Sequence, residues 1–292
     1  MKAAGVNFPV VLMIENKYQV KPPLPFSPGG EAAGVVSGVG PAVNGVKTGD
    51  RVMAITGHGA FAEKVVVSAD RLVGIPAGMN DVTAGAFLFT YATSDHAVRD
   101  RGELREGETM LVLGAAGGVG LAAVEIGKAA GATVIACASS DEKLAVCREH
   151  GADATINYST EDLREGIKRI TGDRGVDVVI DPVGGRFAEP AFRSVAWRGR
   201  FIVVGFAAGD IPRIPLNLAL LKGSSIAGSS LGGWMRREPE SFAQSIRQLL
   251  RWYAEGRIKP HIDRMFPLEQ AGEAIAYMAG RHVRGKVVVT TS

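Results

Sequence analysis

The chain has few of the residues that build disulfide frameworks or metal sites. Its 292 residues include only two cysteines and five histidines. Both cysteines, Cys137 and Cys147, lie in apolar segments typical of a buried strand and a buried helix. Two thiols in such surroundings favour a reducing compartment and exclude a disulfide framework. We therefore expect a cytoplasmic protein.

Neither sign of charge is in marked excess. The 33 basic and 30 acidic residues give a formal net charge of +3 and are mixed along the chain. This balance gives no electrostatic reason to expect nucleic acid or a membrane surface as a partner. The most apolar run, residues 111–126, is interrupted by glycines and by Glu125, which excludes a membrane span. The opening Met1-Lys2-Ala3 does not resemble a secretory leader.

Glycine is abundant, at 38 of 292 residues or about 13%, against a usual ~7%. Residues 1 to about 91 combine glycine and proline with short β-branched runs, for example at 34–36 and 63–67. Short strands separated by turn residues are typical of a small all-β unit.

From about Glu108 onward the pattern changes to alternating strands and helices. We expect buried strands at 109–113, 133–138, 154–157, 176–181 and 200–205. A helix over 119–130 ends at Gly131, and capping boxes are expected at Ser139 with Glu142 and at Ser159 with Asp162. This order predicts an α/β fold with a doubly wound parallel sheet. A further helix over 239–255 and a last strand over 285–289 follow.

The first strand of this region leads into a glycine-rich turn, Gly114-Ala115-Ala116-Gly117-Gly118-Val119-Gly120, and then into a helix. In this context the pattern is a dinucleotide fingerprint. The glycines let the backbone approach a pyrophosphate, and the helix N-terminus offers it free N–H groups and partial positive charge. The alternative is a glycine-rich turn selected for packing alone.

The tip of the second strand indicates which dinucleotide binds. NAD enzymes place an acidic residue there to bind the ribose 2′-hydroxyl. Here the tip is Ser139-Ser140, with Lys143 one turn later. Hydroxyls and a lysine suit a 2′-phosphate, which favours NADPH. Asp141 and Glu142 argue the other way, and we interpret them as acids that stabilise the start of a helix.

With these segments the chain resembles the medium-chain dehydrogenase/reductase superfamily, and most of all its zinc-free quinone oxidoreductase (zeta-crystallin-like) family. The family's fold is a Rossmann domain with a GroES-like β domain and the cofactor in the cleft between them. The resemblance implies a GroES-like domain from residues 1–91 plus 231–292 and a Rossmann domain from 92–230. It rests on residues 4–8, 28–34, 49–52, the glycine loop, 156–158 and 181–185.

The resemblance also implies roles for single residues. By position, Asn7 and Tyr18 resemble residues near the nicotinamide and the substrate. Lys143, Tyr158 and Arg281 resemble the group around the adenosine 2′-phosphate. Simpler roles stay open: Asn7 in a turn, Tyr158 in packing, Arg281 capping a helix. The expected cofactor-binding set is Gly114, Ala116, Gly117, Gly118, Val119, Gly120, Ser139, Ser140, Lys143, Tyr158, Gly205 and Arg281.

We expect no metal. Zinc-dependent relatives have a histidine where this chain has Gly30, and residues 1–91 contain no cysteine and one histidine, His58. Three protein ligands are the minimum for catalytic zinc. Without a Lewis acid, an electron-poor acceptor such as a quinone or an enone is the suitable substrate. Hydroxyl and amide donors from Tyr18 and Asn7 would hold the anion formed from it.

Two departures from the family pattern keep alternatives open. Val10 stands where relatives often have Asp, and the chain begins where relatives have already passed through two or three strands. An incomplete β domain is therefore expected, and a non-catalytic NADPH-binding protein is one alternative. An enoyl-thioester reductase is another. We also expect a homodimer through the strand near 224–229 and a substrate pocket lined by 229–234, with Trp234 either a pocket wall or core.

Overall fold

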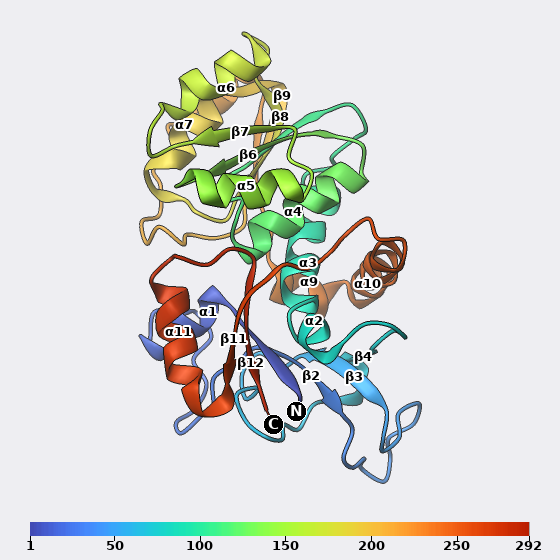
Figure 1. Ribbon diagram of the computed structural model, residues 1–292. Coiled ribbons are helices and arrows are strands. Elements are labelled where there is room, and N and C mark those ends of the chain that lie inside the picture. Colours follow the sequence, from blue (N-terminus) through green and yellow to red (C-terminus); the bar gives the residue numbers. More distant parts are fainter. Residues whose placement is uncertain (292) are drawn as a thin grey trace. The chain divides into compact units, whose positions relative to one another are not determined.

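The computed structural model describes residues 1–291 and divides into two compact units (Figure 1). The first unit contains residues 1–90 together with the segment from Pro260 onward, and the second contains residues 91–259. None of the helices in residues 1–291 is both long enough and apolar enough to cross a membrane.

The first unit is built on a six-stranded sheet in the order β11-β12-β1-β2-β3-β4. All neighbouring strands are antiparallel except β11 and β12. Its elements are β1 (Ala3–Val6), α1 (Phe8–Ile14), β2 (Glu31–Val35), β3 (Arg51–Ile55), η1 (Ala69–Arg71), β4 (Leu72–Gly74), α2 (Asp81–Gly85), β11 (Ile262–Pro267), η4 (Leu268–Gln270), α11 (Ala271–Ala279) and β12 (Lys286–Thr290).

The last strand, β12, is apolar at successive positions because both of its faces are covered. Val287 and Val289 belong to one buried cluster with Phe266 and Ala274 of α11. Val288 points to the opposite face and belongs to a second cluster with Ala86. Alternate side chains of a strand point to opposite faces, so three consecutive valines fill two cores. Strand β12 also pairs with β1, which joins segments near the two ends of the chain in one sheet.

The second unit is a parallel sheet in the order β10-β9-β8-β5-β6-β7, as the sequence predicts. Helices α4 and α5 pack on strands β5 to β7, and α6 and α7 pack on each other and on strands β7 to β9. Its elements are α3 (Leu88–Asp95, which spans the unit boundary), the π-helix η2 (His96–Arg101), β5 (Thr109–Val112), α4 (Gly118–Ala129), β6 (Thr133–Ala138), α5 (Asp141–Glu149), β7 (Ala154–Asn157), α6 (Leu163–Thr171), β8 (Val176–Asp181), η3 (Gly185–Phe187), α7 (Ala188–Arg193), β9 (Val195–Val203), α8 (Asn217–Lys222), β10 (Ser225–Gly228), α9 (Leu231–Arg237) and α10 (Pro239–Ala254).

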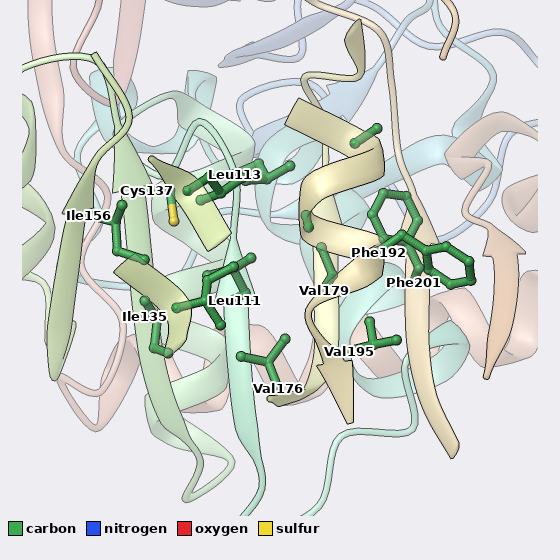
Figure 2. Packing of buried hydrophobic residues seen from close by; sticks show 14 residues of the cluster. Leu111, Leu113, Ile135, Cys137, Ile156, Val176, Val179, Phe192, Val195 and Phe201 are labelled. Carbon is green, nitrogen blue, oxygen red and sulfur yellow. The ribbon is translucent and has the colours of Figure 1, made fainter. Parts of the chain in front are cut away.

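One hydrophobic cluster fills the space between this sheet and helices α6 and α7 (Figure 2). Leu111, Ile135 and Val179 contribute from three neighbouring strands, and Phe192 packs edge-on against Phe201 with ring centroids 5.6 Å apart. The cluster also buries the thiol of Cys137, and burial raises the pKa of this thiol well above its usual value. The cysteines are therefore core residues, as expected.

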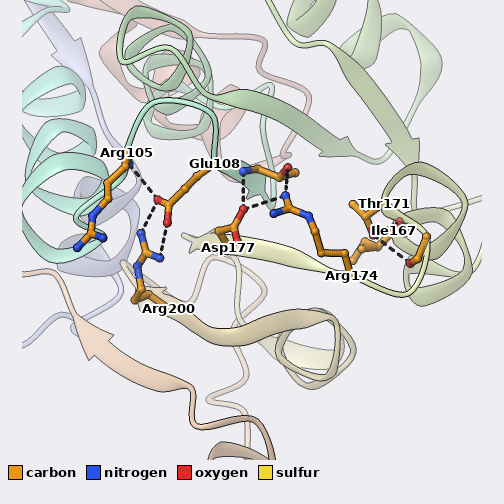
Figure 3. Close-up of polar contacts among 9 residues, drawn as sticks. Arg105, Glu108, Ile167, Thr171, Arg174, Asp177 and Arg200 are labelled. Carbon is orange, nitrogen blue, oxygen red and sulfur yellow. Dashed lines mark hydrogen bonds and ion pairs between the residues drawn. The ribbon is translucent and has the colours of Figure 1, made fainter.

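At the amino ends of the strands, ion pairs tie the sheet together (Figure 3). Arg200 of β9 donates to both carboxylate oxygens of Glu108, at 2.8 and 2.6 Å. Burial by itself would raise the pKa of Glu108, but the hydrogen bonds from Arg200 and Arg105 outweigh it and the pKa is lowered. Asp177 accepts from the Thr109 amide at 2.7 Å and from Arg174 at 3.0 Å.

Two expected helix starts and one strand start are wrong in detail. Ser140, not Ser139, caps α5 and accepts from the Lys143 amide at 3.4 Å. Asp162 itself caps α6, since its carboxylate accepts from the amides of Arg164 and Glu165. The two caps thus lie one and three residues later than expected, at residue types that are favoured at the N-cap. Strand β9 also begins five residues before the expected position 200.

Residues 231–259 belong to the second unit, whereas we expected them in the GroES-like domain. Their side chains pack on η2 and the end of α3. Trp234 stacks on His96 with ring centroids 4.5 Å apart. The Ser245 hydroxyl donates to the buried Asp95 carboxylate at 2.6 Å. Tertiary packing of α9 and α10 therefore sets this boundary, and the sequence pattern carries no sign of it.

Helix α4 starts unusually close to the turn before it. A Cβ atom on Gly120 would lie 2.3 Å from the carbonyl oxygen of Gly114 and 2.7 Å from the Cα atom of Ala115. A Cβ atom on Gly117 would meet only the Gly114 oxygen, at 3.5 Å, which is an ordinary contact. Gly120 is therefore required by packing, while Gly117 is not.

We expect Gly120→Ala to lower the midpoint of thermal unfolding by about 5 °C. Overpacking of this kind costs ~1–3 kcal/mol, and a chain of this size loses ~2–4 °C per kcal/mol. Gly117→Ala is the matched control, and its midpoint should stay within about 2 °C of wild type. Equal melting of the two variants would contradict the packing role of Gly120.

Candidate functional site

The candidate site lies where the strand order of the second unit reverses. From β5 the chain moves outward through β6 and β7, then returns to β8 on the other side of β5. In open parallel sheets, ligands bind at the carboxyl ends of the strands at such a switch point. The segments that follow β5 and β8 are the glycine loop and residues 182–185.

The glycine loop presents backbone amides at this point. Gly114 has a φ of +58°, a left-handed conformation that glycine adopts without strain. Gly117 occupies the N-cap of α4 with no side-chain cap, and Leu121 donates the first bond inside the helix, to the Gly117 carbonyl at 2.7 Å. The amides of Gly118, Val119 and Gly120 thus precede the helix's own hydrogen bonds, as an anion-binding helix start requires.

Across the switch point, a buried carboxylate shapes the loops after β8 and β9. Asp181 accepts from the amides of Val183 and Gly184 through one oxygen, at 2.8 and 2.7 Å. Burial raises the pKa of Asp181, while these two bonds act in the opposite direction. Its carbonyl accepts from Gly205 at 3.2 Å, which holds this expected cofactor residue against the end of β8. Asp181 was absent from the expected site set, although its carboxyl-terminal position on a buried strand is a usable signal.

At the ends of β6 and β7, the structure brings four expected residues together. The Lys143 ammonium donates to the Ser139 hydroxyl at 3.1 Å, and the Lys143 amide donates to Ser140. The Tyr158 amide donates to the Ala138 carbonyl at 3.2 Å. Two hydroxyls and an ammonium form a donor set suited to a phosphate group, with the Tyr158 backbone beside them.

The acidic residue nearest this group is already engaged. Asp141 lies in the first turn of α5 and accepts from the Asn157 side-chain amide at 2.9 Å. The Asn157 oxygen in turn accepts from the Ser159 amide, and the Ser159 hydroxyl donates to the Ser139 carbonyl. Asn157 and Ser159, which sequence reasoning did not assign to the site, therefore hold the serine tip in place.

The packing role considered for Tyr158 is also present. Its ring lies 4.2 Å from that of Phe187, tilted by 37°. This contact packs one side of the phenol ring.

The first unit contains a buried polar cluster around Asn7. The Asn7 amide nitrogen donates to Glu31 at 2.9 Å, and the Asn7 oxygen accepts from the Lys286 ammonium at 2.7 Å. Lys286 also donates to Glu31 at 2.6 Å, and the second Glu31 oxygen accepts from the Phe89 amide. All three side chains are at most 5% exposed. Asn7 is therefore held rigidly by two charges, a role beyond that of a turn residue.

Two other expected residues also lie in the first unit. Tyr18 is half-buried in a bend after α1, and burial raises its pKa. Arg281 is exposed just after α11 with a φ of +58°, and its amide donates to the Met278 carbonyl at 3.1 Å. The expected site residues are thus divided between the two units.

Trp234 belongs to the core of the second unit. It is 4% exposed, stacks on His96 and meets the Phe242 ring edge-on at 5.4 Å. The Ser229 hydroxyl bonds to the His96 Nδ1 at 2.9 Å, and burial lowers the pKa of His96. Of the two roles left open for Trp234, the geometry matches that of a core residue.

Within residues 1–291, no group of three or more His, Cys, Asp or Glu side chains is arranged to hold a metal ion. Glu31 follows Gly30, the position at which zinc-dependent relatives have a histidine. Its carboxylate accepts hydrogen bonds from Lys286 and Asn7. A lysine ammonium beside this carboxylate is incompatible with a cation at the same place. The donor set does not fit zinc.

Comparison with known proteins agrees with this arrangement. Two family models match: an alcohol dehydrogenase GroES-like domain over residues 1–77 and a zinc-binding dehydrogenase domain over residues 118–252. A curated relative from Bos taurus, quinone oxidoreductase-like protein 2, is 39% identical over 98% of this chain and 82% of its own length.

Two solved structures are similar over nearly the whole chain. Quinone oxidoreductase from Escherichia coli, in complex with NADPH, is 31% identical with a TM-score of 0.92, covering 99% of this chain and 89% of that one. The CurK enoyl reductase is 27% identical with a TM-score of 0.88, covering 100% and 89%. This chain therefore belongs to the zinc-free quinone oxidoreductase family of the medium-chain dehydrogenases/reductases.

Proposed function

We propose that this oxidoreductase uses NADPH to reduce a quinone or an enone. The observation that carries the proposal is the donor set at the ends of β6 and β7, where Ser139, Ser140 and Lys143 are joined by hydrogen bonds and Asp141 accepts from Asn157. Such a tip suits a ribose 2′-phosphate better than a 2′-hydroxyl. The family membership and the NADPH complex of a related structure support it.

Different residues of the chain would bind different parts of the cofactor. The amides of Gly118, Val119 and Gly120 receive the pyrophosphate at the start of α4, where the helix dipole adds to the attraction. Lys143 and the serine hydroxyls hold the 2′-phosphate. When bound, NADPH supplies the hydride or the electrons.

Asn7 and Tyr18 are the proposed donors to the acceptor. Lys286 donates to the Asn7 oxygen and polarises the amide, which makes the Asn7 nitrogen a stronger donor. One of its two hydrogens serves Glu31, and the other is available to an oxygen that gains negative charge. Lys286 and Glu31 thus act as positioning residues, and no metal is needed to hold the anion.

An enoyl-thioester reductase is the second candidate. It has the same requirements for NADPH and for an oxyanion donor, and its support is the likeness to an enoyl reductase structure. A non-catalytic NADPH-binding protein is the third, motivated by Val10 in place of the usual Asp. Substrate assays separate the three.

The direct test follows NADPH consumption by absorbance with a simple quinone, an enone and an enoyl-CoA, each with NADH in parallel. We expect turnover with NADPH at a rate well above that with NADH, and faster with the quinone or enone than with the thioester. Faster thioester reduction would favour the second candidate. Cofactor binding without turnover of any acceptor would favour the third.

Replacing Lys143 tests the cofactor preference. We expect Lys143→Met to weaken NADPH binding about tenfold or more, because a charged hydrogen bond is worth ~1.5–3 kcal/mol, while NADH binding is unchanged. The measurement is the dissociation constant of each cofactor by fluorescence titration. Arg148→Met, on the same helix and bonded to Thr155, is the matched control and should leave both constants unchanged. Equal losses for NADPH and NADH would contradict the assignment.

Replacing Asn7 tests the proposed donor. Asn7→Ala leaves the Lys286–Glu31 ion pair in place. We expect kcat to fall about 100-fold, typical of a lost oxyanion donor, with little change in NADPH affinity. The control is Asn80→Ala, which removes a helix cap bond to Thr83 in the same unit without a role in the reaction. A fall in kcat no larger than that of the control would refute a catalytic role for Asn7.

We also propose a homodimer formed by pairing β10 with its counterpart in a second copy. Strand β10 ends the sheet, so one side of its backbone has no neighbouring strand. Unprotected edges of this kind invite pairing. Leu220 and Leu221 on the preceding helix α8 are 80% and 68% exposed, and Ile226 on the strand itself is 39% exposed. These side chains would be buried by a second copy.

Light scattering tests the dimer. We expect the mass of two chains at micromolar concentration and that of one chain for Ile226→Lys. Val66→Lys, which changes a fully exposed valine of the other unit, should remain dimeric. A monomeric wild-type protein would overturn the proposal.

A further inference from the structure

Four arginines line one cavity on the second unit. Arg164 comes from the first turn of α6, Arg186 from η3, Arg193 from the end of α7, and Arg213 from the segment between β9 and α8. The cavity has a volume of about 360 Å³. Helices α6 and α7 pack against each other and α7 packs on η3, so three of the four positions lie on packed helical elements, while Arg213 lies in a segment without helix or strand (Figure 1).

The charges around this cavity are unbalanced. Glu189 is the one carboxylate in its lining, and Arg193 already binds it, at 2.9 and 2.7 Å. Within residues 1–291, Arg164, Arg186 and Arg213 take part in none of the ion pairs found. Three exposed arginines therefore line a shared space without an ion-pair partner in the described part of the chain. Like charges gathered in this way repel one another, and a bound anion removes that cost.

The chemistry of the lining defines the ligand. A guanidinium group offers a planar fork of donors that matches phosphate oxygens in pairs. Three such forks from separate elements suit an anion with more than one phosphate. The volume lies at the lower end of the ~300–1,000 Å³ typical of small-molecule sites. We propose that this arginine cavity binds the diphosphate group of a small molecule, inorganic or nucleotide.

The cavity adjoins the proposed cofactor site but is separate from it. The Arg186 guanidinium lies 4.9 Å from the Phe187 ring centre, and the centre of the Tyr158 ring lies 4.2 Å from it. The glycine loop and Lys143 are not among the residues that line the cavity. The inference goes beyond the proposed function and holds whether or not the enzyme reduces quinones.

The test is calorimetric titration of the full chain with inorganic pyrophosphate, with and without saturating NADPH. Saturation blocks the glycine loop as a competing phosphate site. We expect one pyrophosphate per chain with saturating NADPH, binding at least tenfold tighter than orthophosphate, and this binding event should also be present without NADPH. Tighter binding of ADP than of pyrophosphate would identify a nucleotide as the source of the diphosphate, and the reverse would identify the inorganic ion.

Variants locate the binding. Arg164→Gln with Arg213→Gln should weaken pyrophosphate binding at least tenfold, with NADPH affinity unchanged. Arg236→Gln with Arg237→Gln, on α9, is the matched control for the loss of two charges. Binding that survives the first double variant, or that NADPH abolishes in the wild type, would overturn the proposal. Without any NADPH binding, the comparison of the two double variants in the free protein still decides it.

Discussion

The contact on which the candidate site depends is the approach of Gly120 to the carbonyl oxygen of Gly114. A Cβ atom at this point would lie 2.3 Å from that oxygen, so the start of α4 is pressed directly against the turn that leads to it. This packing sets the direction of the helix and leaves three amides at its start facing the switch point. An arrangement made of backbone alone can bind a pyrophosphate of any dinucleotide.

Choice among dinucleotides then falls to side chains around the second and third strands. Ser140 both caps α5 and accepts from the Lys143 amide, while the Asn157 side chain occupies the Asp141 carboxylate with a hydrogen bond. In the first unit, too, residues outside the expected site set orient one that belongs to it. Lys286 and Glu31 neutralise each other in a buried place and in doing so orient Asn7. In both units, residues outside the expected set position those inside it.

The sequence predicts the parallel sheet, the glycine loop and the serine–lysine tip because these depend on local patterns: apolar runs, glycine spacing and a strand's end. Contacts between residues far apart in the sequence could not be predicted in this way. Lys286 meets Asn7 across 279 positions, and Trp234 stacks on His96 from another helix. No periodicity marks such pairs. The assignment of residues 231–259 failed for the same reason, since it depends on what α9 and α10 bury.

The most direct measurement is the ratio of the NADPH and NADH dissociation constants of the wild-type protein at one salt concentration, by calorimetry without acceptor. Our account predicts that NADPH binds at least about tenfold more tightly, the worth of one charged hydrogen bond to the 2′-phosphate. Equal affinities, or tighter binding of NADH, would contradict the reading of Ser139, Ser140 and Lys143 as a phosphate site.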